Sequence, residues 1–199
     1  MTPNPASALP DGARAVLSFW FEGDGRSGQV REAWFRKDAR FDREIAERFG
    51  PTLEAARQGL LTPWTTTAKG TLALIVVLDQ FSRNIHRGSP LAFAGDAQAL
   101  ALARQLVADD HDRSLDTLER WFAYLPFEHA ESLAEQDESV RLFTALAAED
   151  ERLAGALDYA HRHREVIQRY GRFPHRNDVL GRQSTADEAA YLATPGAGF

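Results

Sequence analysis

Apolar residues recur along much of the chain at spacings of three and four, the period of an amphipathic α-helix. One stripe contains, in order, His129, Leu133, Gln136, Val140, Phe143 and Ala147. A second contains Leu153, Leu157, Ala160, Ile167 and Tyr170. An alternating strand pattern of comparable length is absent from the sequence. The pattern therefore predicts an all-α fold of antiparallel helix pairs stacked into a right-handed layer.

The most apolar segment is "TTTAKGTLALIVVLDQFSRNIH", residues 65–86, which is apolar on nearly every side between Leu72 and Leu78. A buried strand is the rival interpretation. Because the segment continues through Phe81, it is too long for a typical strand, and we expect a central buried helix.

Capping and helix-breaking residues suggest where the other helices begin and end. Gly171 is expected to end a helix, and Thr185 with Glu188 has the spacing of a capping box. Gly50 is expected to separate two helices. The expected helix starts are Asp11, Pro51, the pair Ser89 and Pro90, and Pro126.

The composition, 44% hydrophobic and 26% charged, is typical of a globular protein, and the length of 199 residues favours a single domain. We expect this domain to cover residues 1–199, with residues 1–10 as a flexible tail. The chain has no cysteine, which favours a reducing compartment and the cytoplasm. The amino-terminal stretch lacks a signal-peptide pattern, and the apolar run is too short to cross a bilayer. A net charge of −6 argues against nucleic acid as a partner.

Charge is unevenly distributed along the sequence. Residues 128–151 carry eight acidic side chains and one arginine, a net of −7, whereas residues 161–182 carry six arginines and two acidic side chains, a net of +4. The two segments could pack against each other, or the second could face an anion.

Polar residues concentrate in three motifs. The first motif, "LDQFSRNIHRG" at 78–88, places Asp79 and Arg83 four residues apart, so that they can pair on one helical face. Gln80, Asn84 and Arg87 share an adjacent face. Such groups at the end of an apolar helix need partners, so they either form an internal network or line a cavity.

The second motif, "LPFEHAESLAEQ" at 125–136, puts His129 and Gln136 on the apolar stripe. His129 has two interpretations: a core histidine with one hydrogen bond, or a general base. His129 with Glu131, and His161 with His163, are two residues apart and would point away from each other on a helix, so we expect no metal site. Phosphate loops, dinucleotide fingerprints and other common cofactor motifs are absent, so we expect no cofactor.

The third motif, "RYGRFPHRNDVLGRQST" at 169–185, is a loop rich in arginine between two helices. Its guanidinium groups could bind one carboxylate or phosphate through paired hydrogen bonds. Alternatively, Arg172, Arg176 and Arg182 could tie the loop to helix carboxylates such as Asp79 or Glu131.

With the upstream stretch "WFRKDARFD", these motifs resemble the bacterial family known as domain of unknown function 924 over nearly the whole chain. The resemblance implies a fold like that of tetratricopeptide repeats, and it implies no activity. The polar residues that it carries over are Asp79, Gln80, Arg83, Asn84, His129, Glu131, Gln136, Arg172, His175, Arg176, Asn177 and Arg182. From their chemistry and from the resemblance, we expect the three motifs to share one pocket instead of forming three separate surface patches.

Three functions follow from these residues. The first is binding of a small anion or a peptide carboxylate by Asp79, Gln80, Arg83, Asn84, Gln136, Arg172, Arg176, Asn177 and Arg182. The second is a hydrolase or lyase for an anionic metabolite, with His129 or His175 as the acid–base group and Glu131 as its partner. The third is a polar core without a ligand. The sequence predicts no oligomeric state.

Overall fold

The computed structural model describes residues 8–23 and 28–198, and every regular element within these ranges is a helix. The prediction of an all-α fold is therefore confirmed. Most of the expected flexible tail, residues 1–7, lies outside the described residues. None of the described helices is both long and apolar enough to cross a membrane.

The chain divides into two compact units. The N-terminal unit comprises residues 1–87 and 91–126, and the C-terminal unit comprises residues 88–90 and 127–199. The single domain over residues 1–199 stays a prediction, because two compact units can still fold cooperatively as one domain. The helices up to Pro126 are α1 (Asp11–Leu17), α2 (Ala39–Arg57), α3 (Ala68–Ile75), α4 (Ser82–Ile85), α5 (Asp96–Ala108) and most of α6 (Thr117–Glu128). Those that follow are α7 (Leu133–Glu149), α8 (Ala154–Tyr170) and α9 (Ala186–Leu192).

The central helix of the N-terminal unit is α3, which continues through a π-helical turn, Val76–Phe81, into α4. All residues from Thr71 to Ser82 are buried, so the prediction of a buried helix is confirmed and the strand alternative is excluded. Thr67 caps the start of α3 by accepting a hydrogen bond from the Gly70 amide.

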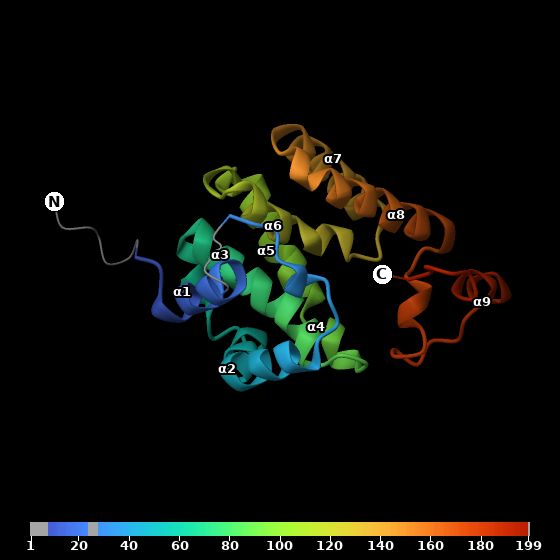
Figure 1. The fold of residues 1–199 in the computed structure, drawn as a ribbon, viewed down its shortest axis with the longest axis horizontal. Coiled ribbons are helices and arrows are strands. Elements are labelled where there is room, and N and C mark those ends of the chain that lie inside the picture. Colours follow the sequence, from blue (N-terminus) through green and yellow to red (C-terminus); the bar gives the residue numbers. More distant parts are fainter. Residues whose placement is uncertain (1–7, 24–27, 199) are drawn as a thin grey trace. The chain divides into compact units, whose positions relative to one another are not determined.

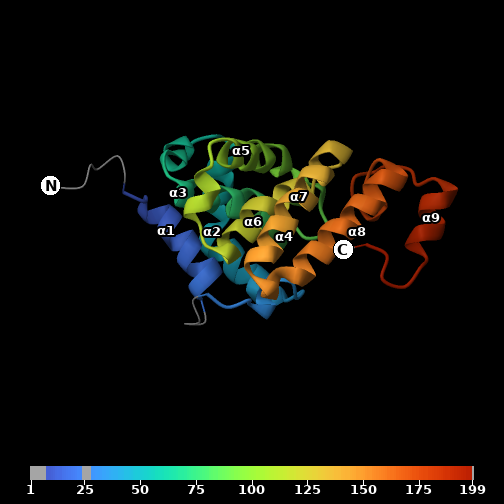
Figure 2. The same ribbon diagram turned by 90° about the horizontal axis from the view of Figure 1, so that it is seen from above.

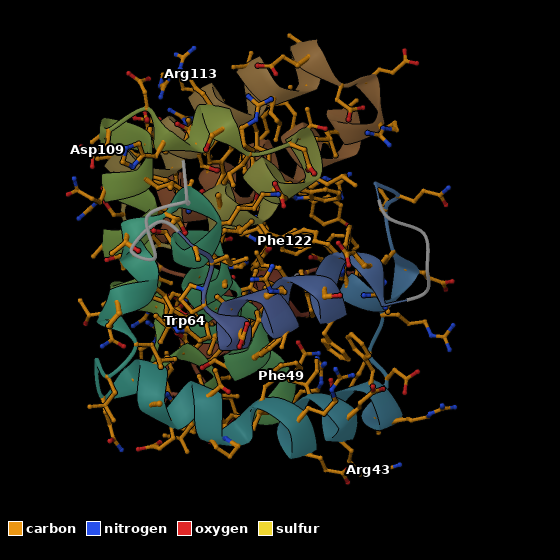
Figure 3. The ribbon with its side chains drawn as sticks, turned by 90° about the vertical axis from the view of Figure 1, so that its left-hand side faces the viewer. Arg43, Phe49, Trp64, Asp109, Arg113 and Phe122 are labelled. Atoms are coloured by element: carbon orange, nitrogen blue, oxygen red, sulfur yellow. The ribbon has the colours of Figure 1, made fainter. Side chains whose placement is uncertain are left out.

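An aromatic cluster fills the core of this unit. The Trp20 ring lies 5.5 Å from that of Phe81 and 5.4 Å from that of Phe122, measured between centroids. Both contacts are edge-to-face, an arrangement that aromatic pairs prefer. Figure 3 shows Phe122 and Phe49 on the two sides of α1, whereas the labelled Arg43, Asp109 and Arg113 lie at the periphery of the unit. The central helix is thus held by large apolar side chains on several sides.

The predicted break at Gly50 and Pro51 is wrong, because α2 runs through both residues. A proline inside a helix costs about 3 kcal/mol, since it removes a hydrogen bond and crowds the preceding turn. Ile45, Phe49 and Leu53 are buried one turn apart on either side of the proline. Their burial outweighs that cost and keeps the helix continuous.

Two predicted helix starts are also wrong. Pro126 lies inside α6 instead of opening a helix, because the run around it from Phe122 to Glu128 is buried as one helix. His129 therefore belongs to the connection between α6 and α7, not to the apolar stripe of α7. Residues Pro90–Phe93 form only a 3-10 turn, and α5 begins at Asp96.

Gly95 explains why α5 starts where it does. A Cβ atom at this position would collide with the backbone carbonyl of Leu78 in the central helix. Only glycine permits this close approach of two backbones. The approach places the first turn of α5 beside the end of the central helix, where Asp96 meets the first polar motif.

The C-terminal unit is built on the pair α7 and α8, which pack side by side along their length (Figure 1). Gly171 ends α8 in the left-handed conformation, with φ of 69°, as the sequence predicts. Helix α9 lies beyond the end of α8 (Figure 2), and Thr185 and Glu188 form the predicted capping box at its start. The tetratricopeptide-like right-handed array of helix pairs stays a prediction.

Candidate functional site

The first motif forms an ion-pair network inside the N-terminal unit. Asp79 is fully buried, and its carboxylate lies 2.9 Å from the Arg83 guanidinium, as the four-residue spacing predicts. Arg83 also donates two hydrogen bonds to Asp96 on α5, of 2.9 and 3.1 Å. Gln80 donates to the second oxygen of Asp79 at 2.5 Å. Burial alone would lower the pKa of Arg83, but the two carboxylates raise it above its ordinary value.

Asp42 on α2 collects the other donors of this motif. It accepts a hydrogen bond of 2.8 Å from Asn84 and two of 2.8 Å from Arg87. These donors lower the pKa of Asp42 although burial opposes the change. The polar end of the central helix is therefore tied to α2 through Asp42 and to α5 through Asp96.

The second and third motifs meet in the C-terminal unit at Glu131. Its carboxylate accepts two hydrogen bonds from Arg182, of 2.6 and 2.9 Å, and one of 2.8 Å from the backbone N–H of Phe173. Burial would raise the pKa of Glu131, but Arg182 and this N–H lower it below its usual value. The pairing of acidic and basic segments suggested by the charge distribution is thus found here and again between Asp137 and Arg164, 2.6 Å apart.

Arg172 and Asn177 converge on a second carboxylate, that of Glu188 in α9. The Arg172 guanidinium donates to both oxygens, at 2.7 and 2.8 Å, and Asn177 donates at 3.3 Å. The Arg172 hydrogen bonds and the Thr185 backbone N–H lower the pKa of Glu188 to about 2. This pair holds α9 against the arginine-rich loop.

Arg176 is almost fully buried. Its guanidinium donates to the backbone carbonyl of His129 at 3.0 Å and lies 4.5 Å from the centre of the Phe173 ring. The His175 ring lies 5.6 Å from the same Phe173 ring, measured between ring centroids. The third motif therefore approaches the His129 and Glu131 region.

Gln136 fixes the connection between α6 and α7. It is fully buried, and its amide nitrogen donates to the carbonyls of Phe127, Glu128 and Ala130, at 3.3, 2.7 and 2.8 Å. The carbonyls of Phe127 and Glu128 lie at the end of α6, where a helix leaves its last acceptors without partners in the helix itself, and Ala130 follows in the connection. Gln136 thus has a capping role that its position on an apolar stripe did not indicate.

A buried glutamate and histidine in the C-terminal unit escaped the sequence prediction. The Nδ1 atom of His163 lies 2.9 Å from the carbonyl of Tyr159 and 3.3 Å from the carboxylate of Glu128, and both side chains are buried. Burial and the neighbouring His129 lower the pKa of His163 to about 3. A signal was available, because His163 continues the apolar positions of α8, three residues after Ala160.

This low pKa predicts that acid destabilises the protein from about pH 6.5 downwards. The unfolded state binds a proton on His163 near pH 6.5, whereas the folded state binds it only near pH 3. Stability is therefore fully present above pH 6.5 and falls with pH, by up to about 1.4 kcal/mol per unit. Urea unfolding between pH 7 and 5 measures the slope. His163→Gln should flatten it, and the exposed control His161→Gln should not; equal slopes in both variants would contradict the assignment.

The polar residues predicted for one site thus lie in two networks. Those of the first motif belong to the N-terminal unit, and those of the second and third motifs belong to the C-terminal unit. The shared pocket of all three motifs stays a prediction. In the part of the chain that the structure describes, no three histidine, aspartate or glutamate side chains are arranged to hold a metal ion.

A cavity of about 410 Å³ opens at a different place in the N-terminal unit. Its polar lining is Ser18, Glu22, Arg31, Glu44 and Arg48. Arg31 is buried and donates to the carbonyls of Phe19 and Trp20, which belong to the π-helical turn Ser18–Glu22. None of these residues was among the predicted site residues.

The chain belongs to a family of bacterial proteins. Residues 16–196 match the family described as "Bacterial protein of unknown function (DUF924)". A solved structure of a protein of unknown function from Agrobacterium tumefaciens, ATU0120, is similar over 91% of this chain and 96% of that one, with 36% identity and a TM-score of 0.82. No curated protein matches the chain. The family resemblance noted in the sequence is therefore confirmed.

Proposed function

We propose that the three polar motifs have a structural role in this helical protein. Their ion pairs and hydrogen bonds hold helices and loops together within each unit, and they do not form a catalytic centre. Charged side chains in each network are joined to partners in the same unit: Arg83 to Asp96, Arg182 to Glu131, and Arg172 to Glu188. The absence of cysteine remains the reason to propose a cytoplasmic location.

The observation that carries this proposal is the occupation of the guanidinium groups. An anion clamp was expected because the arginine-rich loop has more donors than its own acidic residues can accept. Arg182 and Arg172 each direct two N–H groups at a carboxylate from outside the loop, and Arg176 donates to the His129 carbonyl. These acceptors supply what the loop itself lacks.

The contacts of Glu131 bear on the acid–base interpretation. An orienting carboxylate would accept a hydrogen bond from His129 or His175. Glu131 accepts from a guanidinium group and a backbone amide, an arrangement that holds a chain segment in place. The catalytic roles of His129, Glu131 and His175 stay predictions, and the structural role is the one that we propose.

A double-mutant cycle on Glu131 and Arg182 tests the structural role. Both side chains are about a quarter exposed, so we expect a coupling free energy of about 1 kcal/mol or more between Glu131→Ala and Arg182→Ala, as for paired residues in a shared network. Equilibrium urea unfolding gives the four free energies. The exposed pair Arg162 and Asp158 on α8 is the matched control, with an expected coupling below about 0.5 kcal/mol. Equal coupling in the two pairs would contradict the proposal.

A further inference from the structure

Glu131 occupies a site with the geometry of a carboxylate receptor. We call this site the carboxylate cradle, and define it as the Arg182 guanidinium together with the backbone N–H of Phe173. The guanidinium directs two hydrogen bonds at the two carboxylate oxygens, at 2.6 and 2.9 Å, and the N–H adds one of 2.8 Å. Paired donors of this kind recognise a carboxylate more specifically than a single charge does.

The cradle is held in place by its own segment, independently of Glu131. Arg182 donates through Nε to the side chain of Asn177 at 2.9 Å and through Nη2 to the carbonyl of Phe173 at 3.1 Å. Asn177 is in turn held by Ser184, at 3.0 Å, and by Glu188. Removing the Glu131 carboxylate therefore leaves the donors aligned.

Glu131 itself lies on residues 129–132, the connection between α6 and α7. It belongs to neither helix, and its side chain is 26% exposed, as is 24% of Arg182. The carboxylate can therefore leave the cradle without breaking the hydrogen bonds of a helix. Solvent therefore reaches the ion pair on its exposed side.

We propose that the carboxylate cradle is a binding site for an external carboxylate, and that Glu131 is its tethered internal ligand. The ligand chemistry is that of a free small carboxylate or of the C-terminal carboxylate of a peptide, both of which carry the group that Glu131 presents. In the native chain the tether gives Glu131 a high effective concentration, so an external carboxylate binds only when it outcompetes the tether.

Chemical rescue of Glu131→Ala tests this inference. The substitution removes the Cγ atom and the carboxylate, which together correspond to acetate. We expect the variant to melt at a lower temperature than the native chain, and sodium acetate to restore at least half of that loss in a saturable manner. Sodium chloride at the same ionic strength should not. If the variant is unfolded at 25 °C, the same test is the recovery of helical circular dichroism in acetate.

Three further arms complete the experiment. Acetylglycine should restore the melting temperature of Glu131→Ala, and its amide should not. A dipeptide with a free C-terminal carboxylate that restores it at a lower concentration than acetate would assign the peptide terminus as the source of the ligand. The double variant Glu131→Ala with Arg182→Ala should not respond. An equal response to acetate and chloride, or an acetate response that survives the loss of Arg182, would overturn the inference. The structural role of the ion pair is tested separately by its coupling free energy.

Discussion

Arg83→Ala is expected to lower the free energy of unfolding by about 3 to 5 kcal/mol, which is the usual consequence of leaving a buried charge without its partner. Asp79 is fully buried and Asp96 is 23% exposed, and Arg83 neutralises both. Its loss would leave two carboxylates close together at the end of the central helix. Urea unfolding at neutral pH measures the change.

Two variants sharpen this result. Arg43→Ala on the exposed side of α2 (Figure 3) removes the same charge from the surface and should change stability by less than about 0.5 kcal/mol. Adding Asp79→Asn to Arg83→Ala should recover part of the loss, because it removes the stranded charge. A loss in Arg83→Ala as small as that of the surface control would show that the pair does not contribute to the core.

Arg176→Ala is expected to cost about 3 kcal/mol or more, because it removes a buried side chain and a charged hydrogen bond together. Only 6% of Arg176 is exposed, and its guanidinium lies over the Phe173 ring and donates to the His129 carbonyl. The substitution would leave a cavity beside a fully buried aromatic ring. Thermal and urea unfolding should both show the loss.

The packing and charge parts of this effect can be separated. Arg176→Met retains most of the apolar contact with Phe173 and should lose less stability than Arg176→Ala. Arg162→Ala on the exposed side of α8 removes an arginine that is 59% exposed and should cost less than about 0.5 kcal/mol. Equal losses in Arg176→Ala and Arg162→Ala would place Arg176 on the surface.

Hydrophobic periodicity predicted the helical class and the buried central helix, and capping residues predicted the helix end at Gly171 and the helix start at Thr185. The prolines led to wrong helix boundaries at Pro51 and Pro126, because the structure has both residues inside helices. At both positions the flanking apolar residues are buried, and the helix continues. The start of α5 depends on the contact of Gly95 with Leu78, which lies 17 residues away in sequence and leaves no local pattern.

The polar residues were recognisable from the sequence, but their partners were only partly so. The pairs of Asp79 with Arg83 and of Thr185 with Glu188 follow from helical spacing and are found. Asp42 and Asp96, which bind the first motif, lie on other helices and have no signature in the sequence. Glu188 was expected only as a cap, and the structure shows that it also binds Arg172.

The measurement that tests the structural interpretation most directly combines the unfolding of Arg176→Ala with an anion titration of the native chain. We predict a severe loss of stability in the variant. We also predict that 10 mM acetate, phosphate or sulfate leaves the native melting temperature unchanged relative to chloride of equal ionic strength, because the tethered Glu131 occupies the carboxylate cradle and is not displaced at this concentration. A ligand at a hundred times its dissociation constant would instead add about 2.7 kcal/mol. A stable Arg176→Ala variant, together with a saturable anion shift in the native chain that this variant loses, would contradict the account and establish an anion clamp.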